Sequence, residues 1–320
     1  MWKLRLYMVG TLAVIIGVST TFFAVVLAHF GTLNIISLVL LVALFNIVQW
    51  LFAPHLINTL YKVKEVKQAD SPKLYRMVER LSIKSGIKKP KLGIANISIP
   101  NAFAYGSPIA GNCVAVTKGL LETLEEEEVE AVLGHELGHL KHRDVQIMML
   151  VSFLPSLLYL IGRSTMFSAY YGGRRRGGGG ALLIGVASML VYFVLLLFTL
   201  GLSRLREYYA DRHGASIIED GPRKLSEGLA KIVSKTWKMK TLRRKKTFAS
   251  NSFKTLFISD PDRAESDALQ IAEHARATSD QTLVKILVKK RRSFSDSIME
   301  LFSTHPNITK RLKTLQALET

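Results

Sequence analysis

Two histidines and a glutamate within five consecutive positions could carry out chemistry together. They form the pattern His-Glu-x-x-His, as His135, Glu136 and His139. On a helix the two histidines lie one turn apart on the same face. Two neutral imidazoles in that position can bind one Zn²⁺ ion and leave room for a third ligand and a water. Glu136 would then take a proton from that water, so the pattern predicts hydrolysis assisted by one zinc ion per chain.

The sequence around the motif predicts a helix that starts shortly before it. Thr123 is expected to cap the helix, and Glu126, three residues later, would complete a capping box. Gly134 and Gly138 each precede a histidine, although a glycine costs about 1 kcal/mol relative to alanine inside a helix. Bare backbone at these positions would let another segment approach closely. The motif alone also fits a helix with two ordinary histidines, so the zinc hypothesis requires a third ligand.

Glu207 and Asp211 are the candidates that would complete the site. They are four positions apart, which places them on one face of a helix. Glu207 could be the third zinc ligand, and Asp211 could orient a ligating imidazole through its second ring nitrogen. An ordinary charge pair next to a membrane is the alternative interpretation. His142 could compete as a ligand, but its reach toward a site between His135 and His139 is poor.

Four long apolar segments predict a membrane protein. About 20 consecutive apolar residues cross the hydrocarbon core of a bilayer. Residues 6–28, 33–53 and 181–202 meet this requirement, whereas residues 145–162 are interrupted by Pro155 and form a weaker candidate. The lipid bilayer is therefore a predicted partner of this chain.

The charge distribution places the predicted catalytic part on the cytoplasmic side. The chain carries 43 Lys and Arg against 25 Asp and Glu, a net charge of +18. In a membrane protein this excess favours cytoplasmic segments next to anionic lipid rather than nucleic-acid binding. Lys3 and Arg5 precede the first apolar segment and Lys62 follows the second, which puts both ends of that hairpin inside. The single cysteine, Cys113, excludes an intrachain disulfide and fits a reducing compartment.

Residues 145–202 must return the chain to the same side if Glu207 is to join the two histidines. This segment therefore crosses the membrane twice or not at all. The length of the apolar run at 181–202 favours two crossings. Residues 163–180, which are rich in arginine and glycine, are predicted to form a flexible loop between them.

Amphipathic helices and short strands are predicted for the rest of the chain. Residues 71–86 and 223–246 have the apolar spacing of helices, residues 247–262 read as a loop, and strands are predicted at 92–97, 101–106 and 112–117. In the middle strand, Asn101, Ala102, Phe103 and Ala104 alternate small and aromatic side chains. Such a strand could be an exposed edge that pairs with an extended peptide, or an ordinary strand of a sheet.

Taken together and in this order, the motifs resemble the HtpX-type membrane zinc metallopeptidases, relatives of the integral-membrane CAAX prenyl proteases. The resemblance covers nearly the whole chain. It includes the strand Asn-Ala-Phe-Ala, the helix His-Glu-Leu-Gly-His, the segment Ser-Arg-x-Arg-Glu-Tyr-x-Ala-Asp and a C-terminal Thr-His-Pro. A metzincin fits less well, because positions 142 and 145 hold His142 and Val145 instead of glycine and histidine.

The resemblance implies a role for each matching residue. The implied zinc ligands are His135, His139 and Glu207, and the implied catalytic base is Glu136. The supporting carboxylate would be Asp211. The substrate-binding edge would consist of Asn101, Ala102, Phe103 and Ala104. The resemblance also implies that His305, together with Asn101, helps to hold the scissile carbonyl or its oxyanion. For His305, packing at the start of the last helix is the alternative.

The implied fold is a mainly α membrane protein with about four transmembrane or membrane-inserted helices and an α+β zincin-like (gluzincin) catalytic domain with a small sheet. The expected parts are an N-terminal transmembrane hairpin (1–54), the first half of the catalytic domain (55–144), a second hairpin (145–202) and the second half of the catalytic domain (203–320). The implied activity is a zinc endopeptidase in a bacterial or archaeal cell membrane, which cleaves misfolded membrane proteins or peptides on the cytoplasmic side. CAAX-type processing is an alternative, although those relatives have more spans, and a non-catalytic membrane scaffold is another.

Overall fold

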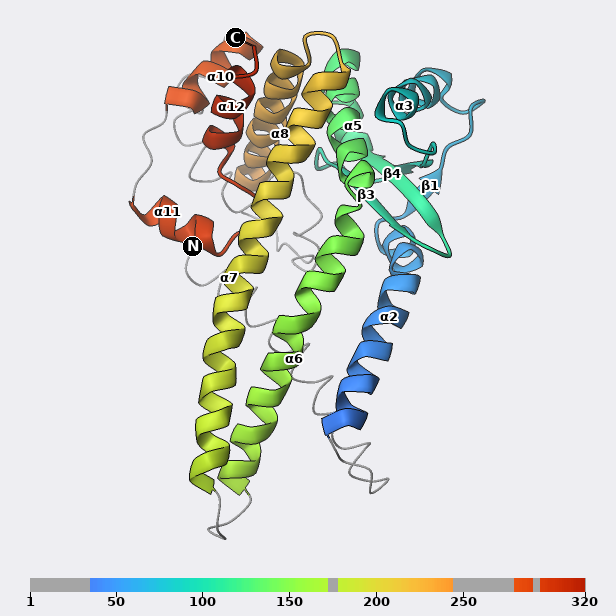
Figure 1. Ribbon diagram of the computed structural model, residues 1–320. Helices are drawn as coiled ribbons and strands as arrows, with labels where there is room; N and C mark the ends of the chain where they lie inside the picture. Colours follow the sequence, from blue (N-terminus) through green and yellow to red (C-terminus); the bar gives the residue numbers. More distant parts are fainter. Residues whose placement is uncertain (1–34, 172–177, 244–278, 290–293, 320) are drawn as a thin grey trace. The chain divides into compact units, whose positions relative to one another are not determined.

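The structure is a computed structural model that describes residues 35–171, 178–243, 279–289 and 294–319 (Figure 1). The chain divides into two compact units. The first contains Met1–Trp50 and Ile147–Thr199, and the second contains Leu51–Gln146 and Leu200–Thr320.

Three helices contribute to the first unit: α2 (Ile35–Leu60), α6 (Asp144–Tyr171) and α7 (Gly178–Ile217). Small residues allow α6 and α7 to lie close together. A Cβ atom added at Gly162 would lie 3.0 Å from Cγ of Met189. The ring centroids of Tyr159 and Tyr192 are 5.2 Å apart.

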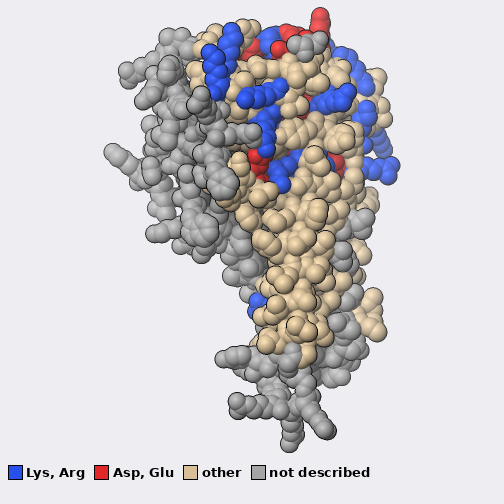
Figure 2. Space-filling model, turned by 60° about the vertical axis from the view of Figure 1, so that its left-hand side comes forward, with Lys and Arg blue, Asp and Glu red and all other residues tan. Residues whose placement is uncertain are grey.

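The described residues of the first unit are almost free of charge. Arg163 is the one charged residue among them, and Figure 2 shows a long surface with little blue or red. Within the described part of the chain, one helical stretch, Leu182–Ile217, has the length and composition needed to cross a membrane. It overlaps the span predicted at 181–202. α2 covers most of the span predicted at 33–53, and the span predicted at 6–28 lies outside the described residues.

α6 is longer than the sequence predicts. A loop is predicted at 163–180, but α6 continues to Tyr171 and α7 begins at Gly178, so the prediction is wrong for residues 163–171 and 178–180. Residues 163–171 contain no glycine or proline that would break a helix. Pro155 lies inside α6 and does not end it, as is tolerated in membrane helices, where neighbouring groups satisfy the freed carbonyl.

A four-stranded sheet begins the second unit. Its strands are β1 (Val63–Glu65), β2 (Lys91–Ala95), β3 (Ala102–Ser107) and β4 (Gly111–Thr117), in the order β1-β2-β4-β3. β2 and β4 are parallel, and the other two pairs are antiparallel. The three predicted strands are confirmed to within two residues, whereas β1 is too short to show an alternating pattern. β3 lies at one edge of the sheet, as the sequence suggests.

The two faces of the sheet carry different cores, because successive side chains of a strand point to opposite faces. On one face, buried Ala102, Val114 and Val116 belong to the main hydrophobic core, and α5 (Glu126–Lys141) packs against β3 and β4. On the other face, Phe103 and Tyr105 form a smaller cluster with Tyr61 and two alanines. β3 is thereby fixed beside the helix that carries the histidine motif.

The remaining helices of the second unit complete the core around α5. They are α3 (Pro72–Ser85), α4 (Lys118–Leu121), α8 (Gly221–Arg243), α10 (Asp280–Lys289), α11 (Phe294–Leu301) and α12 (Ile308–Gln316). α3 and α8 both pack on α5, and α10 and α12 pack on α8. α3 confirms the helix predicted at 71–86, and α8 confirms the one predicted at 223–246 as far as Arg243. The loop predicted at 247–262 lies outside the described residues.

α5 begins at Glu126, with Glu125 as its cap residue. The prediction of a cap at Thr123 is wrong, because the Thr123 hydroxyl donates to the carbonyl of Gly119 in α4. The backbone N–H of Glu125 instead donates to the carboxylate of Glu128, at 2.8 Å. The capping box is therefore shifted by two residues within a run of glutamates, in which several positions could serve.

Glycines let the backbones of α5 and α7 approach each other, which confirms the expectation drawn from Gly134 and Gly138. A Cβ atom on Gly138 would lie 3.0 Å from Cα of Ala210. A Cβ atom on Gly214 would lie only 2.7 Å from the backbone nitrogen of His135. The close contact brings the C-terminal part of α7 against the histidine motif.

Gly214→Ala is expected to destabilise the protein by about 1–3 kcal/mol, because the added methyl group can be accommodated only if α5 and α7 separate. Thermal unfolding in detergent measures the change. Gly201→Ala on the same helix is the matched control, since its Cβ atom would meet nothing closer than 3.6 Å. The control should leave stability equal or raise it by up to about 1 kcal/mol. Equal stability of the two variants would contradict the tight contact.

Candidate metal centre

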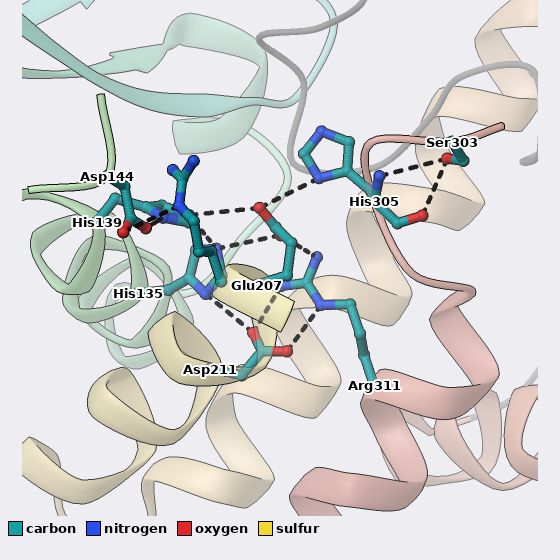
Figure 3. Close-up of polar contacts among 9 residues, drawn as sticks. His135, His139, Asp144, Glu207, Asp211, Ser303, His305 and Arg311 are labelled. Atoms are coloured by element: carbon teal, nitrogen blue, oxygen red, sulfur yellow. Dashed lines mark hydrogen bonds and ion pairs between the residues drawn. The ribbon is translucent and has the colours of Figure 1, made fainter. Parts of the chain in front are cut away.

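Helices α5 and α7 bring His135, His139 and Glu207 together (Figure 3). The histidines lie one turn apart on α5, and Glu207 faces them from α7 across the glycine contact. One possible ligand atom from each residue lies within 4.8 Å of the other two. His135 and Glu207 are buried, and His139 is partly exposed. The site is thus a buried cluster with access to solvent on the side of His139.

Each imidazole contacts a carboxylate through its Nδ1 atom. Nδ1 of His139 is hydrogen-bonded to Oδ2 of Asp144 at 2.6 Å, and Nδ1 of His135 lies 2.9 Å from Oδ1 of Asp211. A carboxylate acceptor keeps the ring proton on Nδ1 and leaves a lone pair on Nε2. The two Nε2 atoms face each other at 3.2 Å. Two lone pairs at this separation repel unless a cation lies between them, so the donor atoms fit a metal ion.

The separations between the donor atoms also fit zinc. Two nitrogens that are each about 2.0–2.1 Å from a tetrahedral zinc ion are about 3.3 Å apart. The observed separation of the two Nε2 atoms is 3.2 Å. The Glu207 carboxylate oxygens lie 3.5 Å from Nε2 of His139 and 3.7 Å from Nε2 of His135. Two histidines and one glutamate form a ligand set that is common for catalytic zinc.

The surroundings of His139 favour a positive charge. Burial by itself lowers the pKa of His139. The hydrogen bond to Asp144 and the nearby carboxylates of Glu207 and Glu136 outweigh this effect and raise the pKa to about 9. A site that stabilises a cation on an imidazole by nearby carboxylates also attracts a divalent ion.

Two arginines neutralise the carboxylates that hold the imidazoles. Arg311, fully buried on α12, donates from Nε and Nη2 to the carboxylate of Asp211 at 2.8 and 2.6 Å. Its Nη1 lies 3.1 Å from Oε2 of Glu207. Nε of Arg206 lies 3.0 Å from Oδ1 of Asp144. Each imidazole therefore ends a chain of contacts that runs through a carboxylate to an arginine, which compensates the buried charges.

A segment between α11 and α12 brings His305 to the same site. Nδ1 of His305 lies 3.3 Å from Oε1 of Glu207. The Ser303 hydroxyl donates to the carbonyl of His305 at 2.9 Å and holds the segment in a turn. α12 itself is capped by Asn307, whose side chain accepts from the N–H of Thr309. His305 therefore does not start the last helix but contacts the candidate metal ligand.

Glu136 lies on α5 between the two histidines, and the edge strand β3 packs against the same helix. Glu136 is buried beside His135 on α5, and its charge contributes to the raised pKa of His139. Asn101, the residue just before β3, is buried, and its backbone N–H donates to the hydroxyl of Thr117. One edge of β3 pairs with β4, and in the described part of the chain no strand pairs with the opposite edge.

Sequence reasoning missed Asp144, Arg206 and Arg311. Asp144 could have been considered, because it is five residues after His139 and starts the next helix. Arg206 and Arg311 carry no spacing signal. His142 does not join the cluster: its ring centroid lies 6.0 Å from that of His213 and 6.1 Å from that of Tyr209.

Comparison with known proteins identifies the family. The model of peptidase family M48 matches residues 68–319, which is most of the chain. The chain belongs to peptidase family M48. This M48 protein is therefore a membrane metallopeptidase.

Relatives of this M48 peptidase match over almost its whole length. A protease HtpX homolog from Thermoplasma acidophilum is 34% identical over 90% of this chain and 88% of the relative. Another HtpX homolog, from Aeropyrum pernix, is 36% identical over 98% of this chain and 95% of the relative. The crystal structure of S. mikatae Ste24p matches with a TM-score of 0.55 at 17% identity, over 98% of this chain and 67% of that one. At this identity the likeness to Ste24p concerns the fold.

Proposed function

We propose that this M48 peptidase cleaves peptide bonds with one zinc ion bound by His135, His139 and Glu207. The observation that carries the proposal is the pair of Nε2 atoms that face each other at 3.2 Å, with the Glu207 carboxylate beside both. Asp211 would orient His135, and Asp144 would orient His139, through their contacts with Nδ1.

Glu136 is proposed to act as general base and then as general acid. A bound zinc ion supplies Lewis acidity, which polarises the scissile carbonyl and lowers the pKa of the attacking water. The Glu136 carboxylate takes one proton from that water while the water oxygen attacks the carbonyl carbon. The same proton is then passed to the leaving amine as the C–N bond breaks. His305 is proposed to donate a hydrogen bond to the carbonyl oxygen as negative charge develops on it.

Substrates are proposed to bind as extended peptides along the free edge of β3. Asn101, Ala102, Phe103 and Ala104 would pair with the substrate backbone, because an edge strand offers a row of N–H and C=O groups. The packing of α5 against β3 supports this arrangement, since it places the edge next to the histidine motif. Recognition through the backbone would tolerate many sequences.

The proposed biological role is quality control of misfolded membrane proteins on the cytoplasmic side of the cell membrane. The net charge of +18 supports the cytoplasmic orientation. The relatives from Thermoplasma acidophilum and Aeropyrum pernix are described as protease HtpX homologs, which supports endoproteolysis. Because the likeness to Ste24p is one of fold, prenyl-protein processing is not proposed.

Metal content tests the ligand set. The purified protein is expected to contain one zinc ion per chain, and removal of zinc by a chelator should abolish peptide cleavage until zinc is added back. His139→Ala should lose zinc, because a ligand of the site is removed. Elemental analysis, with cleavage of a fluorogenic peptide in detergent, provides both readouts.

His142→Ala is the matched control for this experiment. His142 lies on the same stretch of chain but outside the cluster, so this variant should keep its zinc. Equal zinc content in His139→Ala and wild type would overturn the ligand set.

A further inference from the structure

The C-terminal half of α11 and the turn after it expose apolar side chains and bury polar ones, the reverse of a helix on a water-facing surface. Ile298, Leu301 and Phe302 are 44, 49 and 44% exposed. Glu300 and Ser303, by contrast, are buried, and Glu300 pairs with Lys310 of α12 at 2.7 Å. A helix next to water would be expected to turn these apolar side chains inward. We therefore expect another molecule to shield this apolar surface from water.

Arg204 attaches the end of α11 to α7. Its Nη1 atom donates to the backbone carbonyls of Glu300, Leu301 and Ser303, at 2.8, 3.1 and 2.8 Å. Arg204 is the first charged residue after the apolar run at 181–202 on the same helix. If that run crosses the membrane, Arg204 marks the level at which water begins. Its three hydrogen bonds then fix the C-terminal end of α11 at this level.

The sequence before α11 is strongly basic. Within the five residues before Phe294, the first residue of α11, lie Lys289, Lys290, Arg291 and Arg292. Basic residues next to an apolar helical face are typical of helices that lie in the interface of anionic membranes. A folded protein partner fits less well, since stable protein interfaces use about 20–30 residues on each side and this surface has three.

We propose that α11 is an interfacial membrane helix, seated in an anionic bilayer surface through Ile298, Leu301 and Phe302. The same helix holds the segment that carries His305, because Arg204 binds the carbonyls on which that segment starts. The bilayer surface would thus support the segment that carries His305. The proposal concerns the seating of α11 and does not depend on the zinc chemistry.

Quenching of site-specific labels tests this seating. The background is Cys113→Ala, which removes the single cysteine, and the full-length protein is reconstituted in vesicles of phosphatidylcholine and phosphatidylglycerol. A fluorophore is attached to a cysteine at position 298, 301 or 302. Brominated lipid is expected to quench these labels about twofold or more above the controls, and aqueous iodide should quench them less.

The matched controls are labels at Ser297 and Ile83. Ser297 is an exposed polar residue of α11 itself, and Ile83 is a 75% exposed apolar residue on α3. Both should be quenched by iodide and little by brominated lipid. Strong iodide quenching at 298, 301 and 302 would show that water covers the surface. Protection of these labels from both quenchers would show that protein covers it. Either result overturns the proposal, whether or not the protein cleaves peptides.

Discussion

Glu136→Gln protein is expected to retain its metal and to lose peptide-bond cleavage by a factor of about 10²–10⁴. The amide has nearly the shape of the carboxylate, so the packing around buried Glu136 should persist. An amide cannot take a proton from water, and the step that activates the nucleophile is therefore lost. Zinc content by elemental analysis and kcat/KM on a fluorogenic peptide measure the two effects separately.

Glu126→Gln is the matched control for that experiment. Glu126 lies in the first turn of the same helix, with a side chain that is 61% exposed and pairs with Lys73 on the surface. This variant should cleave peptides at the wild-type rate. Retained cleavage by Glu136→Gln, purified free of other peptidases, would remove Glu136 from the mechanism.

Arg311→Met is expected to destabilise the protein by about 3–5 kcal/mol, because it leaves the carboxylates of Asp211 and Glu207 buried without their cationic partner. The loss should be accompanied by weaker zinc binding, since Asp211 and Glu207 would no longer be held in place. Thermal unfolding in detergent, with and without added zinc, measures both effects. Zinc should stabilise the variant less than the wild type, because a ligand that binds more weakly adds less to the stability of the folded state.

Lys313→Met on the same helix is the control, since Lys313 is exposed. It should change stability by less than about 0.5 kcal/mol. Arg311→Lys separates charge from geometry: it keeps one positive charge but cannot contact both oxygens of Asp211 at once. If Arg311→Met proved as stable as Lys313→Met, the buried network would not hold the site.

Local spacing explains what the sequence could predict. His135 and His139 share a helix face whatever surrounds them, and the same holds for Glu207 and Asp211 on α7. Gly134 and Gly138 indicated that another segment packs closely on the helix, because each glycine lowers helix stability unless a close contact requires it. The alternation in β3 likewise indicated a strand.

Contacts between distant residues explain what the sequence could not predict. Arg311 meets Asp211 from a helix one hundred positions away, and an isolated arginine carries no sign of its partner. The cap of α5 lies in a run of glutamates where several registers are equally good. The extension of α6 to Tyr171 was not predicted, because residues 163–171 run directly into a stretch rich in arginine and glycine that indicates a loop.

The order of the ligands along the chain has a consequence for biosynthesis. His135 and His139 leave the ribosome well before Glu207, and Arg311 follows a further hundred residues later. A nascent chain that ends before α7 lacks Glu207 and cannot complete the cluster of three ligands. Helices α6 and α7 must both be made first. The proposed zinc site therefore cannot form before α7 has been made, and the arginine that neutralises its carboxylates arrives last.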